Sequence, residues 1–328
     1  MKRFFVGGFF LVCIGAWWIS SVSAGALAIE SGDSVNSVAG KLKTSGIIRS
    51  ATAFKIAFRV FGSGKHVYPG YIEIDEACNL LCVMNKVTAV NDRSVRVVLT
   101  EGQDIHDLAD ELSAKKILGA ADIVSITGRP ATIGTARFAY EEEFGFLKEV
   151  PKNISYEGYL FPDTYNFSQN ADAESVVRTM LNNFDRRVTP QMRAAAKERG
   201  RTLFEVVTMA SILEKEVRRP EEQRMVADIL WRRLDKGMGL QVDSSVSYIS
   251  QAKGVYTTKE QRASTSLWNT YKYRGLPIGP IGNPGLAAIE AALSPKENNF
   301  WFYLTSPDGS VHYGRTLEEH VANKRFLK

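Results

Sequence analysis

The chain has 328 residues, 45% of them hydrophobic, and a formal net charge of +5. The length suits two or three domains, and so mild a charge gives no indication of nucleic-acid recognition. The three Cys and four His residues lack metal-ligand spacing, so we expect no disulfide framework, no catalytic metal and no cofactor. We interpret Cys78 and Cys82 as small buried hydrophobic residues.

The N-terminus combines a positive flank with an apolar stretch. Lys2 and Arg3 precede the apolar residues 4–19, and a weaker tail continues to residue 29. These lengths bracket the roughly 20 residues that span a bilayer. Because a positive flank stays in the cytoplasm, we expect residues 1–26 to form a retained anchor that exports the rest of the chain. The alternative is a cleaved signal peptide that ends near Ala24.

Residues 29–48 and 99–118 form an internal repeat with a constant offset of 70. Each copy predicts a short strand, a Gly turn and a helix, which Asp33 or Ser34 caps in the first copy and Asp104 in the second. The unit resembles the start of a LysM module, a small fold associated with N-acetylated glycans, and is equally typical of a simple packing unit. We expect an α+β fold throughout, with a small domain at residues 27–95 and a larger one at 96–328.

Residues 202–217 predict an amphipathic helix that begins with a capping box of Thr202 and Glu205. Two carboxylates, Glu214 and Glu216, flank its apolar face, and apolar surroundings raise the pKa of a carboxyl toward that of a general acid. Glu214 has Arg218 four residues on, which predicts an ion pair. Glu216 has Pro220 there and no cation, which favours it as the acid. The pattern alone leaves a structural charge equally open.

The following segments predict further elements. A second helix runs from Pro220 to about Lys236, with Gly237 as its left-handed end. Residues 238–248 look like a loop, and a rigid Gly/Pro loop at 275–285 leads into a short helix at 286–293. A hairpin turns at Asp308-Gly309, and Thr316 caps the last helix.

Five blocks together resemble the endolytic murein transglycosylase family, the YceG-like proteins. The blocks are residues 157–165, 209–216, 240–248, 269–285 and 312–320. The resemblance implies a single-pass enzyme of the inner membrane, a lyase whose catalytic domain at 96–328 cuts peptidoglycan glycan strands in the periplasm. It implies Glu216 as the essential acid, a role in terminating nascent strands, and cell-wall synthases as candidate partners.

A lytic transglycosylase can work with one carboxylate, because a hydroxyl of the sugar itself is the nucleophile. The candidates for binding sugar and acyl groups, each of which could equally be structural, are Asp163, Gln241, Asp243, Asn269 and Tyr271. One alternative is a non-catalytic peptidoglycan-binding scaffold, in which Glu216 is salt-bridged and dispensable. Another is a hydrolase that uses Asp243 or Asp163 as a second carboxylate.

Overall fold

The computed structural model describes residues 22–29, 33–62, 65–68, 70–75, 77–88, 94–251 and 257–327. They divide into two compact units, one with the described residues up to Arg96 and Asn166–Ala171, the other with those of Val97–Tyr165 and Asp172–Lys328. Most of the expected anchor at residues 1–26 lies outside the described residues. Within them, helices are too short or too polar to cross a bilayer.

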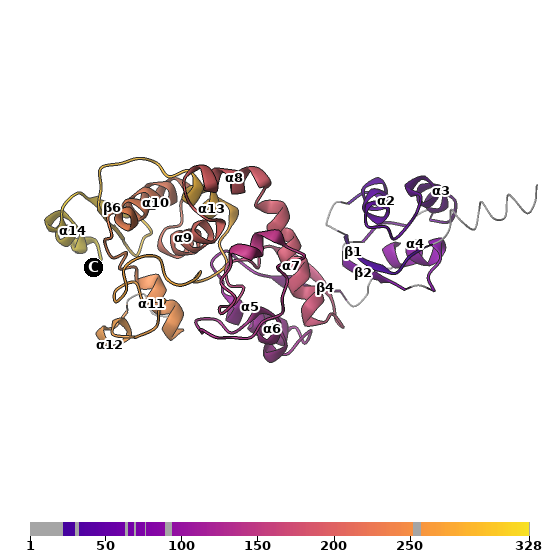
Figure 1. Cartoon of the computed structure of the whole chain (residues 1–328), viewed down its shortest axis with the longest axis horizontal. Coiled ribbons are helices and arrows are strands. Elements are labelled where there is room, and N and C mark those ends of the chain that lie inside the picture. Colours follow the sequence, from indigo (N-terminus) through magenta and orange to yellow (C-terminus); the bar gives the residue numbers. More distant parts are fainter. Residues whose placement is uncertain are drawn as a thin grey trace, which may run out of the picture. The chain divides into compact units, whose positions relative to one another are not determined.

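The smaller unit is an α+β assembly (Figure 1). Its elements are β1 (Gly25–Ile29), α2 (Val35–Thr44), α3 (Ala51–Phe61), β2 (Gly70–Ile74) and α4 (Leu80–Thr88). β1 and β2 pair antiparallel, with Leu27 opposite Ile72. Val38, Ala39 and Leu42 of α2 are fully buried. The strand-turn-helix order expected of the first repeat is therefore present, with Ser34 as the cap of α2; the LysM resemblance stays a prediction.

The interpretation of Cys78 and Cys82 as small buried hydrophobic residues is wrong, because the two form a disulfide across a Cα–Cα distance of 5.4 Å and Cys82 is only half-buried. Cys78 precedes α4 and Cys82 lies in its first turn. That placement brings the two Cα atoms within the 4.4–6.8 Å that a disulfide requires. The sequence argument considered only frameworks of several disulfides and missed this local one.

The larger unit is mainly helical. Its elements, after β3 (Ser94–Val98), are α5 (Ile105–Ala114), α6 (Ala120–Thr127), η1 (Gly145–Glu149), β4 (Thr164–Ser168), α7 (Ala173–Arg187), α8 (Pro190–Glu198), α9 (Leu203–Glu216), α10 (Pro220–Asp235), α11 (Asp243–Ser250), α12 (Lys259–Arg262), α13 (Leu286–Leu293), β5 (Phe302–Thr305), β6 (Val311–Gly314), α14 (Leu317–Asn323) and η2 (Lys324–Leu327). β3 pairs with β4 and β5 with β6. The second repeat is present as β3 and α5, which Asp104 caps. The α+β class is confirmed.

Helix α9 is the centre of this unit and contacts α8, α10, α11 and α13 (Figure 1). The predicted capping box is confirmed, since Thr202 and Glu205 each accept from the other's backbone N–H. The expected apolar face is also confirmed, with Val207, Ala210 and Leu213 at 0% exposure. Burying such a face against neighbouring helices is the main source of stability for a helix of this length.

Four local predictions after α9 are confirmed. Pro220 is the first residue of α10, and Gly237 follows that helix with a φ of 64°. The hairpin β5–β6 forms, and Thr316 caps α14. The expected loop at 238–248 is wrong in part, because α11 begins at Asp243. Ser, Val, Tyr and Ile are weak helix formers, so this helix depends on its packing against α9.

Candidate active site

Glu216 is the last residue of α9, and its two carboxylate oxygens have separate hydrogen-bond donors. Its Oε1 accepts from the backbone N–H of Ser244 at 3.4 Å, and its Oε2 accepts from the hydroxyl of Tyr303 at 3.0 Å. Ser244 lies in the first turn of α11, where backbone N–H groups have no partner within the helix. The residue as a whole is half-buried, and its carboxyl is held in place by these two donors.

The surroundings of Glu216 favour a carboxyl that keeps its proton. Burial raises its pKa above the ordinary value, the hydrogen bonds from Ser244 and Tyr303 oppose that rise, and the negative charge of Asp243 adds to it. The result is a raised pKa, which brings the group closer to neutral pH. This is what a general acid requires.

Glu214 has a different role from the one predicted. Its Oε2 accepts from the backbone N–H of Gly285 at 2.9 Å, in place of the expected ion pair with Arg218. Gly285 is the N-cap of α13, which packs against α9, and a helix N-terminus favours a carboxylate. Glu214 therefore links α9 to α13. Because this contact gives Glu214 a structural role, it agrees with the choice of Glu216 as the acid.

Asp243 and Tyr271 lie together beside Glu216. The Asp243 Oδ1 atom accepts from the hydroxyl of Tyr271 at 2.8 Å and from that of Thr257 at 2.6 Å. Asp243 is the first residue of α11 and directly precedes Ser244, the donor to Glu216. The first turn of α11 thus places Asp243 next to Glu216, and the hydrogen bond from Tyr271 brings that residue to the same place.

Gln241 and Asn269 occupy contrasting positions. Gln241 is exposed and has a φ of 53°, a left-handed conformation that is uncommon outside Gly. Asn269 is at 0% exposure, and its amide nitrogen donates to the backbone oxygens of Arg262 and Ser264. Its side-chain oxygen accepts from the N–H of Tyr271. Asn269 therefore orders the loop that carries Tyr271.

Asp163 bonds to α7. Its Oδ2 accepts from Asn183 and from Arg187, each at 3.0 Å, and its Oδ1 accepts from the N–H of Thr164. Partial burial disfavours its ionised form, but these hydrogen bonds outweigh that effect and lower its pKa. The structure thus gives Asp163 a packing role at α7 and does not join it to the hydrogen bonds around Glu216.

Glu157 is a second buried carboxyl, which sequence reasoning did not select. It is 2% exposed, and its oxygens accept from the N–H of Ile105, the hydroxyl of Tyr248 and the amide of Asn283, at 3.0–3.2 Å. Burial, aided by the charge of Asp104, raises its pKa to about 8. The folded protein therefore keeps a proton that the unfolded chain loses above pH 4.5. As the pH rises from there toward 8, the free energy of unfolding falls, because ionisation favours the unfolded chain.

Tyr303 and Ser244 were also not predicted as site residues. The aromatic run around Tyr303 alternates along β5, so every second side chain faces the same side. This alternation predicts that one face of β5 is buried, but it does not predict that α9 packs against that face. In the part of the chain that the structure describes, no cluster of His, Cys, Asp or Glu could hold a metal ion.

The fold and the site together define an α+β protein whose central helix ends in a carboxyl with the environment of a general acid. The chain belongs to the YceG-like family, whose model matches residues 27–326. The chain is similar to an endolytic murein transglycosylase of Bacillus subtilis (strain 168), at 27% identity over 305 residues, which cover 91% of this chain and 84% of that protein.

Two further comparisons agree. An endolytic murein transglycosylase of Streptococcus pneumoniae serotype 2 (strain D39) is 27% identical over 234 residues, which cover 70% of this chain and 42% of that protein. The chain thus matches less than half the length of that relative. The crystal structure of a yceG-like protein from Listeria monocytogenes aligns with a TM-score of 0.61 and 26% identity, covering 92% of this chain and 98% of that one.

Proposed function

We propose that this chain is an endolytic murein transglycosylase, a lyase that cleaves the glycan strands of peptidoglycan without consuming water. The observation that carries the proposal is Glu216, a half-buried carboxyl with a raised pKa at the end of the central helix. The names of the relatives from B. subtilis and S. pneumoniae support the same substrate class.

In the proposed reaction, Glu216 protonates the oxygen that links C1 of MurNAc to GlcNAc, and the C1–O bond breaks. The carboxylate then takes the proton of the MurNAc C6 hydroxyl, whose oxygen bonds to C1. The product ends in 1,6-anhydro-MurNAc, and Glu216 regains the proton that it gave. Because the nucleophile belongs to the sugar, proximity replaces an encounter with water.

The neighbours of Glu216 fit these two roles. Tyr303 and the N–H of Ser244 stabilise the carboxylate after it has given its proton. Asp243, fixed by Tyr271, supplies a negative charge for the positive charge that develops at C1. We assign sugar contacts to Gln241, Asp243 and Tyr271. We assign Asn269 to the ordering of the loop that carries Tyr271, and Asp163 to packing against α7.

A hydrolase is the second candidate, because Asp243 lies beside Glu216 and is a ready second carboxylate. A non-catalytic scaffold is less favoured. That alternative expects a salt-bridged Glu216, whereas its partners among the described residues are the neutral donors Ser244 and Tyr303.

The proposed location is the inner membrane, with residues 1–26 as the anchor and the catalytic part in the periplasm. The support is the positive flank at Lys2 and Arg3 followed by apolar sequence. Peptidoglycan lies in that compartment, which is consistent with the proposed substrate. Cell-wall synthases that extend the same strands are the proposed protein partners.

The proposal is tested with Glu216→Gln, with Glu214→Gln as the matched control. Gln keeps the size of Glu216 but has no proton to give, so cleavage of purified strands should fall by about 10²–10⁴-fold or more. Gln at 214 keeps an oxygen for the N–H of Gly285, so that variant should cleave at close to the wild-type rate. Undiminished release of anhydro ends by Glu216→Gln, measured by mass spectrometry, would refute the assignment.

A further inference from the structure

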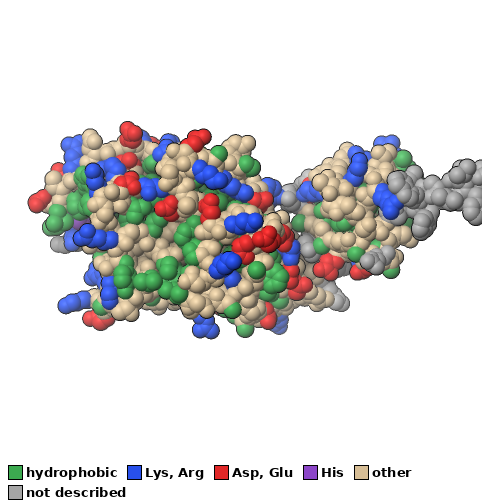
Figure 2. All heavy atoms as spheres, viewed as in Figure 1, with side chains coloured by type: hydrophobic (Ala, Val, Ile, Leu, Met, Phe, Trp, Pro, Cys, Tyr) green, Lys and Arg blue, Asp and Glu red, His purple; other side chains and the backbone are tan. Residues whose placement is uncertain are grey.

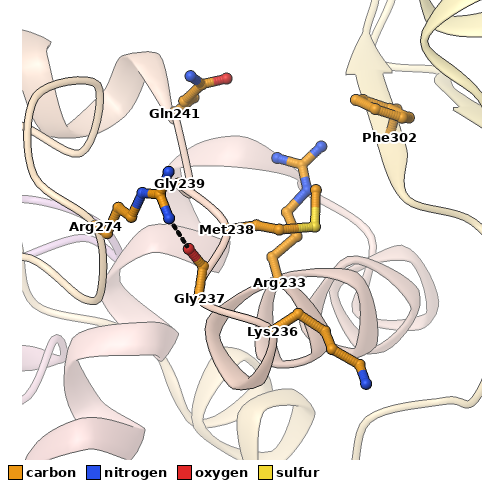
Figure 3. A pocket seen from close by; sticks show the side chains of 8 residues that line it. All are labelled: Arg233, Lys236, Gly237, Met238, Gly239, Gln241, Arg274 and Phe302. Atoms are coloured by element: carbon orange, nitrogen blue, oxygen red, sulfur yellow. Dashed lines mark hydrogen bonds between the residues drawn. The ribbon is translucent and has the colours of Figure 1, made fainter.

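A pocket of about 330 Å³ lies at the C-terminal end of α10 (Figure 3). Its lining residues are Arg233, Lys236, Gly237, Met238, Gly239, Gln241, Arg274 and Phe302. Three of them carry a positive charge and none a negative one. We call it the cationic pocket. Its volume is at the lower end of the range for ligand sites, so it suits a branch of a polymer better than a whole disaccharide.

The cations of the pocket lack acidic partners. None of Arg233, Lys236 and Arg274 forms an ion pair with a carboxylate in the described part of the chain. Arg232, the neighbour of Arg233 on α10, does pair, with Asp228 at 2.9 Å. Of the three, only Arg233 is buried, and a buried charge normally has a counter-charge. The charge of Glu216 acts on Arg233 without forming an ion pair, so the three cations together still favour an anionic ligand.

Arg233 is the fixed base of this pocket. It is 8% exposed, and its guanidinium donates to the backbone oxygens of Trp301 and Leu240 at 2.8 and 3.0 Å. It also lies over the ring of Phe302, with 5.1 Å between Cζ and the ring centroid. A guanidinium held in this way is pre-organised for a carboxylate, because few of its own rotamers remain to be ordered on binding.

The pocket adjoins the candidate active site through two short segments. Phe302 lines the pocket, and Tyr303, on the opposite face of the same strand, donates to Glu216 and is itself acted on by the charge of Arg233. Gln241 lines it as well, three residues before Ser244, the other donor to Glu216. The negative charge of Glu216 also acts on Arg233. A group bound here would therefore belong to the sugar at the scissile bond or to the next one.

We infer that the cationic pocket binds a carboxylate on the lactyl branch of MurNAc, either that of the lactyl group or one on its stem peptide. The inference rests on the proposed function. An enzyme that cuts inside a strand meets carboxylates on every second sugar, whereas phosphates occur only at strand ends. Met238 and Phe302 give the same pocket an apolar wall for the methyl groups next to these carboxylates.

General attraction between a basic protein and an acidic polymer does not account for such binding. The net charge is only +5, and Figure 2 shows Lys or Arg side chains interspersed with Asp and Glu over the face drawn. The selectivity should therefore reside in the pocket. A test therefore needs one variant that removes positive charges from the cationic pocket and a control variant that removes the same number of positive charges elsewhere on the surface.

The test variant is Lys236→Gln with Arg274→Gln, two exposed rim residues, and the control is Lys197→Gln with Arg199→Gln on and just after α8. Each pair removes two positive charges. KM and kcat are measured on peptide-bearing strands, on strands freed of peptide, and on peptide-free strands whose lactyl carboxylates are methyl esters. Circular dichroism melts check folding, and each single substitution is measured alongside.

The rim variant should raise KM about tenfold on strands with free carboxylates and leave KM on the esterified strands unchanged. A rise on peptide-bearing strands alone identifies a stem-peptide carboxylate, because the lactyl carboxyl of those strands is bonded to the peptide as an uncharged amide. A rise on peptide-free strands alone identifies the lactyl carboxylate, which is free only there. An equal rise on esterified strands, or a rise no larger than that of the control variant, overturns the inference. Failure of the wild type to cut any of the strands refutes the proposed function instead.

Discussion

Tyr303→Phe removes one of the two hydrogen bonds to Glu216 while keeping the aromatic ring. The hydroxyl of Tyr303 donates to Oε2 of Glu216 at 3.0 Å, and this bond favours the ionised carboxylate. Without it, burial and the charge of Asp243 have less opposition, so the pKa of Glu216 should rise further. The protonated form of Glu216 then persists to higher pH. Because its ionised form has lost a hydrogen bond, Glu216 also becomes a weaker acid.

A hydrogen bond to a charged group contributes about 1.5–3 kcal/mol, and one pH unit corresponds to about 1.4 kcal/mol. Because Glu216 is only half-buried, we take the lower end and expect the basic limb of the kcat/KM profile to move up by about one pH unit. Tyr313→Phe is the control, since Tyr313 is the cross-strand partner of Tyr303 and its hydroxyl has no hydrogen-bond partner among the described residues. A limb that stays in place, or moves to lower pH, in Tyr303→Phe would refute this reasoning.

Three further predictions concern stability and are measured by denaturant unfolding. The stability advantage of the wild type over Glu157→Gln should shrink by up to about 1.4 kcal/mol per pH unit between pH 5 and 8, and a constant difference contradicts the proton assigned to Glu157. Asn283→Ala strips partners from several buried groups, including Glu157, and should cost about 3 kcal/mol or more; a loss below about 1 kcal/mol contradicts this. Replacing Cys78 and Cys82 by Ser should destabilise the smaller unit by about 2 kcal/mol and leave cleavage unchanged, and unaltered stability argues against the disulfide.

Elements whose signals are local were predicted from the sequence. The capping box at Thr202, the left-handed stop at Gly237 and the hairpin around Asp308 each depend on residues within a few positions of one another. The apolar face of α9 follows from a period of 3.6 residues, which no distant contact alters. The selection of Glu216 over Glu214 also used near neighbours, namely Pro220 and Arg218.

The features that sequence missed depend on distant contacts. Glu214 bonds to Gly285, 71 residues away, and Glu157 bonds to Asn283, 126 residues away. Helix α11 has weak intrinsic propensity and forms where it packs on α9, so its residues looked like a loop. The role of Tyr303 follows from the placement of a hairpin against α9, which no pattern within β5 specifies.

The central claim is that Glu216 drives cleavage with the sugar's own hydroxyl as the nucleophile, and cleavage in ¹⁸O-labelled water tests it most directly. Purified strands are incubated with the wild type and with Glu216→Gln, and the new ends are weighed by mass spectrometry. The account predicts anhydro ends without label from the wild type and about 10²–10⁴-fold fewer ends from the variant. Labelled reducing ends would contradict it and identify a hydrolase in which Asp243 serves as the second carboxylate.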